Sequence, residues 1–402
     1  MPDAPSRSGR LLVGAAIILL ALNLREAVSS VGVLLNALRA ELGMSTTVAA
    51  VLTSLPVVCF AVFGGTTHGL VRRVGLNRSA AALLTIAALA LGLRAVVDDQ
   101  FVFIFASAVA LSACAVGNVI LPALTKAHFP DRVPLMSAAY GAAIMCGGAI
   151  GSVVSVPIAD AFGSWRAGIG VWALLALVAA LTWLRFLGRD VHVDPTAPTH
   201  LPLRVLARSR LAWAAALCFG FQAAQAYAQF GWFPAILTDG GLSRGEAGVM
   251  LAVIGAVGMP VTLSMPLLVR WAGDRPILPW SFALLTMSGW VGVLTSPTDV
   301  TWLWAVLLGV GGCSFTWTLT MLGQRTRTPD GTAALSSFAQ GLGYVVAALG
   351  PLGVGVLHDV TGAWTASVWM LLLGTLLIGF FGTILNRDVY LEDTLPPRDP
   401  RA

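Results

Sequence analysis

The chain has 402 residues, of which 57% are hydrophobic and only 11% charged, and its formal net charge is +5. Soluble domains hold about 25% charged residues, so this composition excludes a soluble globular protein, and the long apolar runs exclude a disordered chain. The sequence therefore predicts an all-α membrane protein with many spans. The five cysteines all lie in apolar runs without metal-site spacing, so we expect no disulfide framework, no metal and no other cofactor.

Twelve apolar runs are long enough to cross a bilayer, which takes about 20 helical residues. We expect an N-terminal six-helix bundle over residues 1–188, a cytoplasmic linker over 189–210, and a C-terminal six-helix bundle with a short cytoplasmic tail over 211–402. The predicted spans cover residues 11–38, 46–70, 79–97, 101–124, 134–159, 166–187, 211–237, 246–269, 277–296, 301–323, 332–357 and 364–385.

The basic residues are distributed unequally between the loops. With the N-terminus inside, 19 cations fall in cytoplasmic segments and four in outer ones, an excess that is typical of cytoplasmic loops. We therefore expect both termini in the cytoplasm, and we attribute the basic charge to topology and not to nucleic-acid binding. The abundance of Arg and Ala favours a bacterial source, and hence the bacterial cytoplasmic (inner) membrane. The four outer cations are Arg39, Arg94, Arg166 and Arg244.

The two halves of the chain resemble each other. At a shift of 199 residues Asp160 meets Asp359 and Trp165 meets Trp364. A half-length repeat with six spans per half indicates two parallel bundles, with a solute site near the midplane where they meet. Further matched pairs are Cys114 with Cys313, Gly163 with Gly362 and, at a shift of 198, Gly75 with Gly273.

Two six-span halves, a long central loop and this length resemble the major facilitator superfamily. Short motifs along nearly the whole chain resemble, more specifically, its cyanate/2-nitroimidazole (CynX/NimT-type) transporters. The resemblance implies the major facilitator fold and a secondary transporter, not an enzyme. The motifs are Leu22-Asn23-Leu24-Arg25 with Val28-Ser29-Ser30-Val31-Gly32, Gly117-Asn118-Val119-Ile120-Leu121-Pro122-Ala123-Leu124 with Phe129-Pro130-Asp131-Arg132, Gln222…Tyr227…Trp232-Phe233-Pro234, Leu335-Ser336…Gln340…Gly343-Tyr344…Gly350-Pro351, and His358-Asp359…Gly362-Ala363-Trp364.

The chain departs from the family pattern at two places. In the loop after span two the superfamily usually carries an Asp ahead of Arg-x-Gly, whereas Arg72 occupies that position here, before Arg73 and Gly75. We therefore expect Arg72 and Gly75 to act in gating or packing without the usual ion pair. In the CynX/NimT-type pattern Pro follows the first-helix Arg, whereas this chain has Glu26, an additional ionisable group.

Arg25 and Glu26 are the charged residues that the sequence places deep inside a span. A charge at that depth is costly and has to face a wet cavity or a fixed partner, so we expect Arg25 to bind the solute through its planar donor fork. The alternative is a structural arginine bonded to helix carbonyls. Asn23 lies on another face and is expected in packing or gating.

Glu26 is the candidate coupling residue, because the sequence places no other carboxylate at its depth. Arg25 beside it would keep it ionised while the site is empty, and an arriving anion would let solute and proton bind together, which is symport. The alternative is a packing residue that is hydrogen-bonded to a neighbouring span.

Polar and aromatic residues on other spans complete the predicted site. Gln222, Gln225 and Gln229 share one face of span seven, and such amides either bind solute or hold helices together. The facilitator fold lines its cavity with spans one, four, seven and ten, which adds Asn118 and Trp317. The predicted substrate-binding residues are Arg25, Asn118, Gln222, Gln225, Tyr227, Trp317, Gln340 and Tyr344.

The sequence thus favours transport of a small polar or anionic solute by alternating access in a lipid bilayer, with protons as a candidate coupling ion and the chain as a monomer. A drug or metabolite exporter of the same superfamily is the alternative within transport. A non-transporting membrane sensor or an intramembrane enzyme is the alternative from another class. No nucleotide-binding motif points to ATP.

Overall fold

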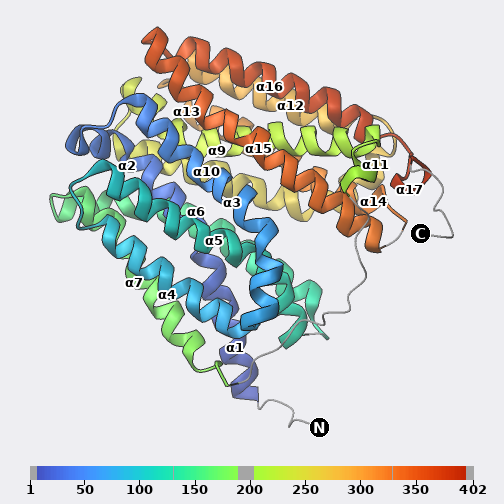
Figure 1. Ribbon diagram of the computed structural model, residues 1–402. Coiled ribbons are helices and arrows are strands. Elements are labelled where there is room, and N and C mark those ends of the chain that lie inside the picture. Colours follow the sequence, from blue (N-terminus) through green and yellow to red (C-terminus); the bar gives the residue numbers. More distant parts are fainter. Residues whose placement is uncertain (1–6, 130, 189–202, 328, 395–402) are drawn as a thin grey trace.

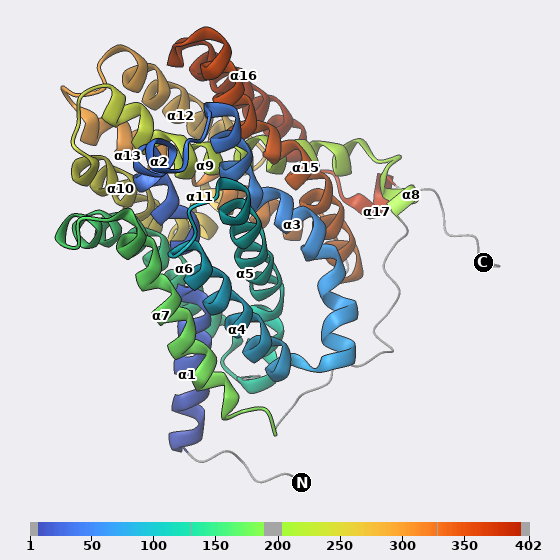
Figure 2. The ribbon, with the colours of Figure 1, turned by 60° about the vertical axis from the view of Figure 1, so that its left-hand side comes forward.

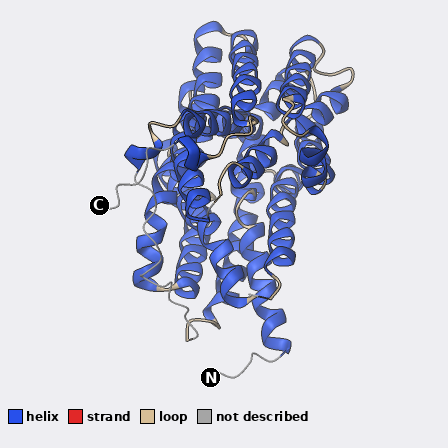
Figure 3. Cartoon of the chain, turned by 90° about the vertical axis from the view of Figure 1, so that its right-hand side faces the viewer, coloured by secondary structure: helices blue, strands red, loops and turns tan. Residues whose placement is uncertain are grey.

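The computed structural model describes residues 7–129, 131–188, 203–327 and 329–394, and within these ranges its regular structure is helical, with no strand (Figure 3). The expected linker therefore lies mostly outside the described residues. The first half contains α1 (Arg7–Leu22), α2 (Glu26–Leu42), α3 (Thr46–Val74), α4 (Leu76–Arg94), α5 (Gln100–His128), α6 (Val133–Ala161) and α7 (Trp165–Leu184). The second half contains α8 (Leu203–Leu206), α9 (Arg210–Asp239), α10 (Arg244–Leu263), α11 (Met265–Ala272), α12 (Ile277–Thr295), α13 (Thr301–Gly311), α14 (Ser314–Gln324), α15 (Pro329–Thr361), α16 (Trp364–Leu385) and α17 (Leu391–Thr394).

Eleven helical stretches of the described chain are long and apolar enough to cross a membrane. The remaining predicted span, 211–237, lies in α9, which has 30 residues but carries three glutamines that lower its hydropathy. Each of the twelve predicted spans therefore coincides with one long helix or with a pair of helices in line.

Three predicted spans are interrupted. Span one breaks at residues 23–25 between α1 and α2, span eight breaks at Ser264, and span ten breaks between α13 and α14 at Gly312 and Cys313. Long apolar runs flank each break, so hydropathy averaged over a span predicts a continuous helix there. The break in span one lies near the centre of the apolar stretch Gly9–Leu42 and therefore near the middle of the bilayer.

The helices form two bundles. Helices α1–α7 pack mainly on one another and form the N-terminal bundle, and helices α9–α16 form the C-terminal bundle. Figures 1 and 2 show them as two groups of helices, blue to green and yellow-green to red. The bundles meet where α3 packs on α15, α6 on α10 and α2 on α9. A site between the bundles is therefore built largely from α2, α3, α9 and α15.

The turns confirm the internal repeat. Among the described residues, the ones with positive φ are six glycines, and these form three pairs related by the repeat. Side chains rarely adopt this conformation, so both halves need glycine at the same corners. The pairs are Gly43 with Gly241, Gly75 with Gly273, and Gly163 with Gly362.

The bundles are joined by hydrogen bonds at the end of the molecule where α2 and α9 finish. Asn36 donates to Thr238 Oγ1 at 3.1 Å, and Thr47 Oγ1 donates to Asp359 at 2.6 Å. Arg244 pairs with Asp160, with an N–O distance of 3.6 Å. We call this region the sealed end.

Candidate functional site

The break in span one is possible because α6 presents glycines to it. A Cβ on Gly147 would lie 3.0 Å from the carbonyl carbon of Leu22, and one on Gly151 would lie 2.8 Å from the Cα of Glu26. Any larger residue would push α6 away from the turn. The glycines thus hold the backbone of Arg25, which precedes the first residue of α2, deep inside the protein.

Arg25 directs its side chain at the C-terminal bundle and lies among three aromatic rings. Its Nη1 donates to the hydroxyl of Tyr227 at 3.1 Å. Its guanidinium carbon lies 6.0 Å from the ring centre of Phe60, 5.6 Å from that of Tyr227 and 5.8 Å from that of Phe230, which is within cation–π range. We call Phe60, Tyr227 and Phe230 the aromatic cage. Since Phe60 comes from α3 and the others from α9, both bundles build it.

Further aromatic rings extend the cage across the interface. Tyr344 of α15 stacks on Phe60 with ring centres 5.4 Å apart, and Phe219 of α9 meets Tyr344 edge-on at 5.1 Å. The structure thus brings Arg25, Tyr227 and Tyr344 together, as the sequence predicts for a shared site. The buried Nε of Arg25 has no hydrogen-bond partner among the described residues, so the guanidinium retains a donor for a ligand.

Glu26 and Asn23 flank Arg25 but lie inside the N-terminal bundle. Glu26 is fully buried, and neither carboxylate oxygen has a hydrogen-bond partner in the described part of the chain. Asn23 donates from Nδ2 to the carbonyl of Leu19 at 2.7 Å, which is a bond within the end of α1. Arg25 and Glu26 are adjacent in sequence, but the Arg25 side chain contacts the C-terminal bundle, whereas Glu26 is buried in the N-terminal bundle.

The three glutamines of α9 are buried, and two of them bond to other helices. Gln222 donates to the carbonyl of Gly312 at 3.1 Å, in the break of span ten. Gln225 donates to the carbonyl of Leu371 at 2.6 Å and accepts from Trp290 Nε1 at 2.8 Å, so both ends of its amide hold the C-terminal bundle together. Of these two, Gln222 retains a buried amide oxygen without a partner, which is available to a ligand.

The other predicted residues lie outside the aromatic cage. Asn118 is half-buried on α5 and donates to the carbonyl of Cys114 at 3.3 Å. Trp317 is fully buried in the core of the C-terminal bundle, and Gln340 is half-buried on α15, one turn before Tyr344. Their roles in binding stay predictions.

Besides Asn23, the residues predicted for gating or packing are Arg72 and Gly75, at the junction of α3 and α4. Gly75 precedes α4 with φ +94°, a conformation that favours glycine and turns the chain there. The side chain of Arg72 lies outside what the structure describes, so its role also stays a prediction.

Phe60, Phe230 and Arg94 are the residues of this region that the sequence interpretation missed. Phe60 carries no signal in an apolar span, although Phe230 could have been found three residues after Tyr227 on the same helix face. Arg94 was expected in an outer loop and is instead fully buried, so Arg25 and Glu26 do not hold the only deep charges. Arg94 is the last residue of α4, where basic side chains usually face the solvent. The sequence does not show that this side chain turns inward.

The arrangement suits binding without covalent chemistry. A fixed cation with a free donor, placed among ring faces, holds a small planar molecule that carries negative or electron-rich oxygen atoms. Within the described residues, no group of three His, Cys, Asp or Glu side chains could hold a metal ion. The site therefore has the components of a solute-binding site at the interface of two bundles.

Comparison with known proteins places these features in a family. Residues 11–351 match the sequence model of the Major Facilitator Superfamily. The chain is 32% identical to "Uncharacterized transporter YycB" of Bacillus subtilis (strain 168), over 93% of each chain. It is 30% identical to the 2-nitroimidazole transporter of Escherichia coli (strain K12), over 95% of this chain and 97% of that one. It is also 30% identical to the cyanate transport protein CynX of the same organism, over 86% and 90%.

The solved structures agree on the fold. A bacterial homologue of the human lysosomal transporter Spinster, in an inward-facing and unoccupied conformation, superposes with a TM-score of 0.80 over 98% of this chain and all of that one. The two sequences are 14% identical, so this likeness concerns the fold alone.

Proposed function

Because the chain belongs to the Major Facilitator Superfamily, whose members are transporters and not enzymes, we propose that it moves a small polar or anionic solute across the membrane by alternating access between its bundles. The observation that carries this proposal is Arg25, held at mid-membrane depth with a free donor inside a cage that both bundles build. A solute bound there touches both bundles, and so it can bias their relative position.

The solute class follows from the shape of the cage and from the relatives. Cyanate, a linear anion, and 2-nitroimidazole, a planar ring, are named for two relatives, and both are small with electron-rich heteroatoms. The guanidinium fork can donate to such atoms, and the aromatic rings around it supply the apolar surface of the site. Ala223 stands at the repeat position of Arg25, so we expect the N-terminal bundle to anchor the charge.

We further propose that the chain lies in the bacterial cytoplasmic membrane as a monomer with both termini inside, and that Glu26 couples transport to protons. The excess of cytoplasmic cations supports the orientation, and it grows once the buried Arg94 is removed from the outer count. In this orientation the sealed end faces outward. A single chain supplies both faces of the cage, which supports the monomer.

Ligand-induced stabilisation of the purified chain tests the proposal, because a solute stabilises the state that it binds. We expect 2-nitroimidazole or cyanate to raise the Tm of the wild type. Arg25→Ala should lose that shift, and Arg25→Lys should restore little of it, because Lys lacks the planar fork. Arg185→Ala, an exposed arginine at the end of α7, is the matched control and should keep the full shift. A full shift in Arg25→Ala would refute the assignment of the site.

A further inference from the structure

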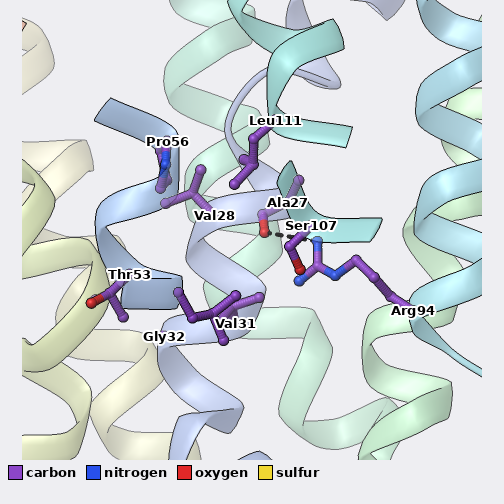
Figure 4. Close-up of a pocket in the computed structure, with 11 residues that line it drawn as sticks. Ala27, Val28, Val31, Gly32, Thr53, Pro56, Arg94, Ser107 and Leu111 are labelled. Atoms are coloured by element: carbon purple, nitrogen blue, oxygen red, sulfur yellow. Dashed lines mark hydrogen bonds between the residues drawn. The ribbon is translucent and has the colours of Figure 1, made fainter. Parts of the chain in front are cut away.

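Arg94 is a buried charged residue that does not belong to the proposed solute site. It is the last residue of α4, yet its side chain is fully buried and turns toward α2 (Figure 4). Its Nη1 donates to the carbonyl of Ala27 at 3.4 Å, and its guanidinium carbon lies 5.1 Å from the ring centre of Phe103. These neutral contacts do not balance its charge.

Several polar atoms around Arg94 lack a partner. Arg94 Nε and Nη2 and the buried hydroxyl of Ser107 have none among the described residues. Arg94 and Ser107 line a cavity of about 10 Å³, shown in Figure 4, which also reaches Thr53 and Gly231. The cavity is lined mainly by apolar residues and has room for about one water molecule beside Arg94 and Ser107. Such a water could hydrate the guanidinium, but it would leave the charge unbalanced.

Glu26 is a buried charged group of the opposite sign that, in the described part of the chain, also lacks hydrogen-bond partners. It is as deeply buried as Arg94, its two carboxylate oxygens have no hydrogen-bond partner among the described residues, and it immediately precedes Ala27, whose carbonyl accepts from Arg94. Arg94 and Glu26 are not in direct ion-pair contact in the described structure, but Arg94 Nη1 reaches the carbonyl of the residue that follows Glu26, so both charged groups are buried at the first turn of α2. Two buried charges of opposite sign are far less costly together than either is alone.

The other charged and titratable groups near Glu26 are Arg25 and the thiol of Cys114. Arg25 directs its guanidinium at Tyr227 and the aromatic cage, in the other bundle. Since its guanidinium is held there, Arg25 does not pair with Glu26, whose carboxylate oxygens have no hydrogen-bond partner among the described residues. The Cys114 thiol donates to the carbonyl of Asn23 at 3.4 Å.

We propose that Glu26 and Arg94 form a buried counter-ion pair inside the N-terminal bundle, so that Arg94, and not the adjacent Arg25, balances the charge of Glu26. This rests on the proposed function, because it names the partner of the coupling residue. The proposal assigns two functions to two separate places, although Arg25 and Glu26 are adjacent in the sequence. Arg25 binds solute between the bundles. Glu26, which gains and loses the proton, is paired with Arg94 inside the N-terminal bundle. The turn at residues 23–25 connects the solute site to this pair, because it carries Arg25 and leads directly into Glu26.

A double-mutant cycle in Tm, measured at neutral pH without any solute, tests the pair. Glu26→Gln should lower the Tm of the wild type, because an arginine cannot lose its charge and would stay buried without a counter-ion. In an Arg94→Met background the same change should leave the Tm unchanged or raise it. In an Arg94→Lys background, which keeps the charge, Glu26→Gln should again lower the Tm.

The matched control is the same cycle with Arg25→Met, in which Glu26→Gln should lower the Tm as much as it does in the wild type. If Glu26→Gln alone does not fold, folding of the Glu26→Gln/Arg94→Met chain is the supporting result. The proposal is overturned if Glu26→Gln has the same effect with and without Arg94, if coupling appears in the Arg25 cycle instead, or if neither the single nor the double variant folds. Since no solute is present, this test can fail while solute binding at Arg25 succeeds, and the reverse also holds.

Discussion

Gly231→Ala should disfavour the conformation in which the bundles are joined at the sealed end. Gly231 of α9 packs directly on Thr53 of α3, and a Cβ there would lie 2.8 Å from the Cβ of Thr53 and 2.9 Å from its Cγ2. Carbon atoms in contact normally lie about 3.5–4.0 Å apart, so the two helices must separate by about 0.7–1.2 Å. The Cβ of Thr53 is fixed to its backbone and cannot swing aside.

This separation destabilises only the conformation in which the bundles are joined at the sealed end. Overpacking a buried contact costs about 1–3 kcal/mol. Because α3 and α9 belong to different bundles, a conformation in which the bundles have moved apart at this level escapes the clash. The population ratio should therefore shift about 5- to 150-fold away from the sealed conformation.

Disulfide trapping across the sealed end measures that ratio. Asn36 and Thr238 are hydrogen-bonded at 3.1 Å, so cysteines at both positions should cross-link in a Cys146→Ser background, which lacks the exposed native thiol. Gly231→Ala should slow the cross-linking, and Thr53→Gly, which removes the opposing Cβ, should restore it.

Gly245→Ala on α10, where an added Cβ meets nothing within 4 Å, is the matched control and should leave the cross-linking rate unchanged. An unchanged rate in Gly231→Ala would show that this contact does not set the equilibrium.

Three smaller perturbations test other contacts. Glu26→Gln in proteoliposomes should abolish the proton movement that accompanies solute addition while exchange continues, and equal proton movement in this variant would exclude the coupling role. Gln225→Leu should lower the free energy of unfolding by about 1–3 kcal/mol, because it leaves Trp290 Nε1 buried without a partner; an unchanged free energy in chemical unfolding would contradict this. Thr47→Val removes the bond to Asp359 at the sealed end, worth about 0.5–1.5 kcal/mol, and should raise labelling of a cysteine placed at position 36 less than Gly231→Ala does.

The membrane spans could be predicted closely from the sequence, because a bilayer imposes length and hydropathy on each helix. The predicted spans 277–296 and 364–385, for example, differ from α12 and α16 by at most one residue at either end. The repeat was equally visible, and the paired positive-φ glycines show its physical basis in shared turns. Hydropathy did not reveal the break at residues 23–25, because the glycines that permit it lie more than 120 residues later, on α6.

The site could be predicted only in part, because sequence shows which residues are polar but not where their side chains point. Arg25 and Tyr227 were found through the cost of a charge at mid-span and through a family motif. Gln225 is, like Gln222, an amide in an apolar helix, and the sequence does not distinguish the two. In the structure both ends of the Gln225 amide are bonded within the C-terminal bundle, whereas the Gln222 oxygen has no partner among the described residues. Arg94 was misplaced for the same reason, since a charge at a helix end can face either solvent or the core.

Because span one is broken, a new helix begins near the centre of the membrane. The N–H groups of Glu26 and Ala27 have no backbone acceptor among the described residues, and the aligned peptide units give that end of α2 a partial positive charge. The last carbonyls of α1 end at the same turn and carry the opposite partial charge, so the break sets a backbone donor end and a backbone acceptor end side by side at mid-membrane depth. This polar backbone accompanies Arg25 and Glu26 in an otherwise apolar span, and it remains when Arg25 is replaced.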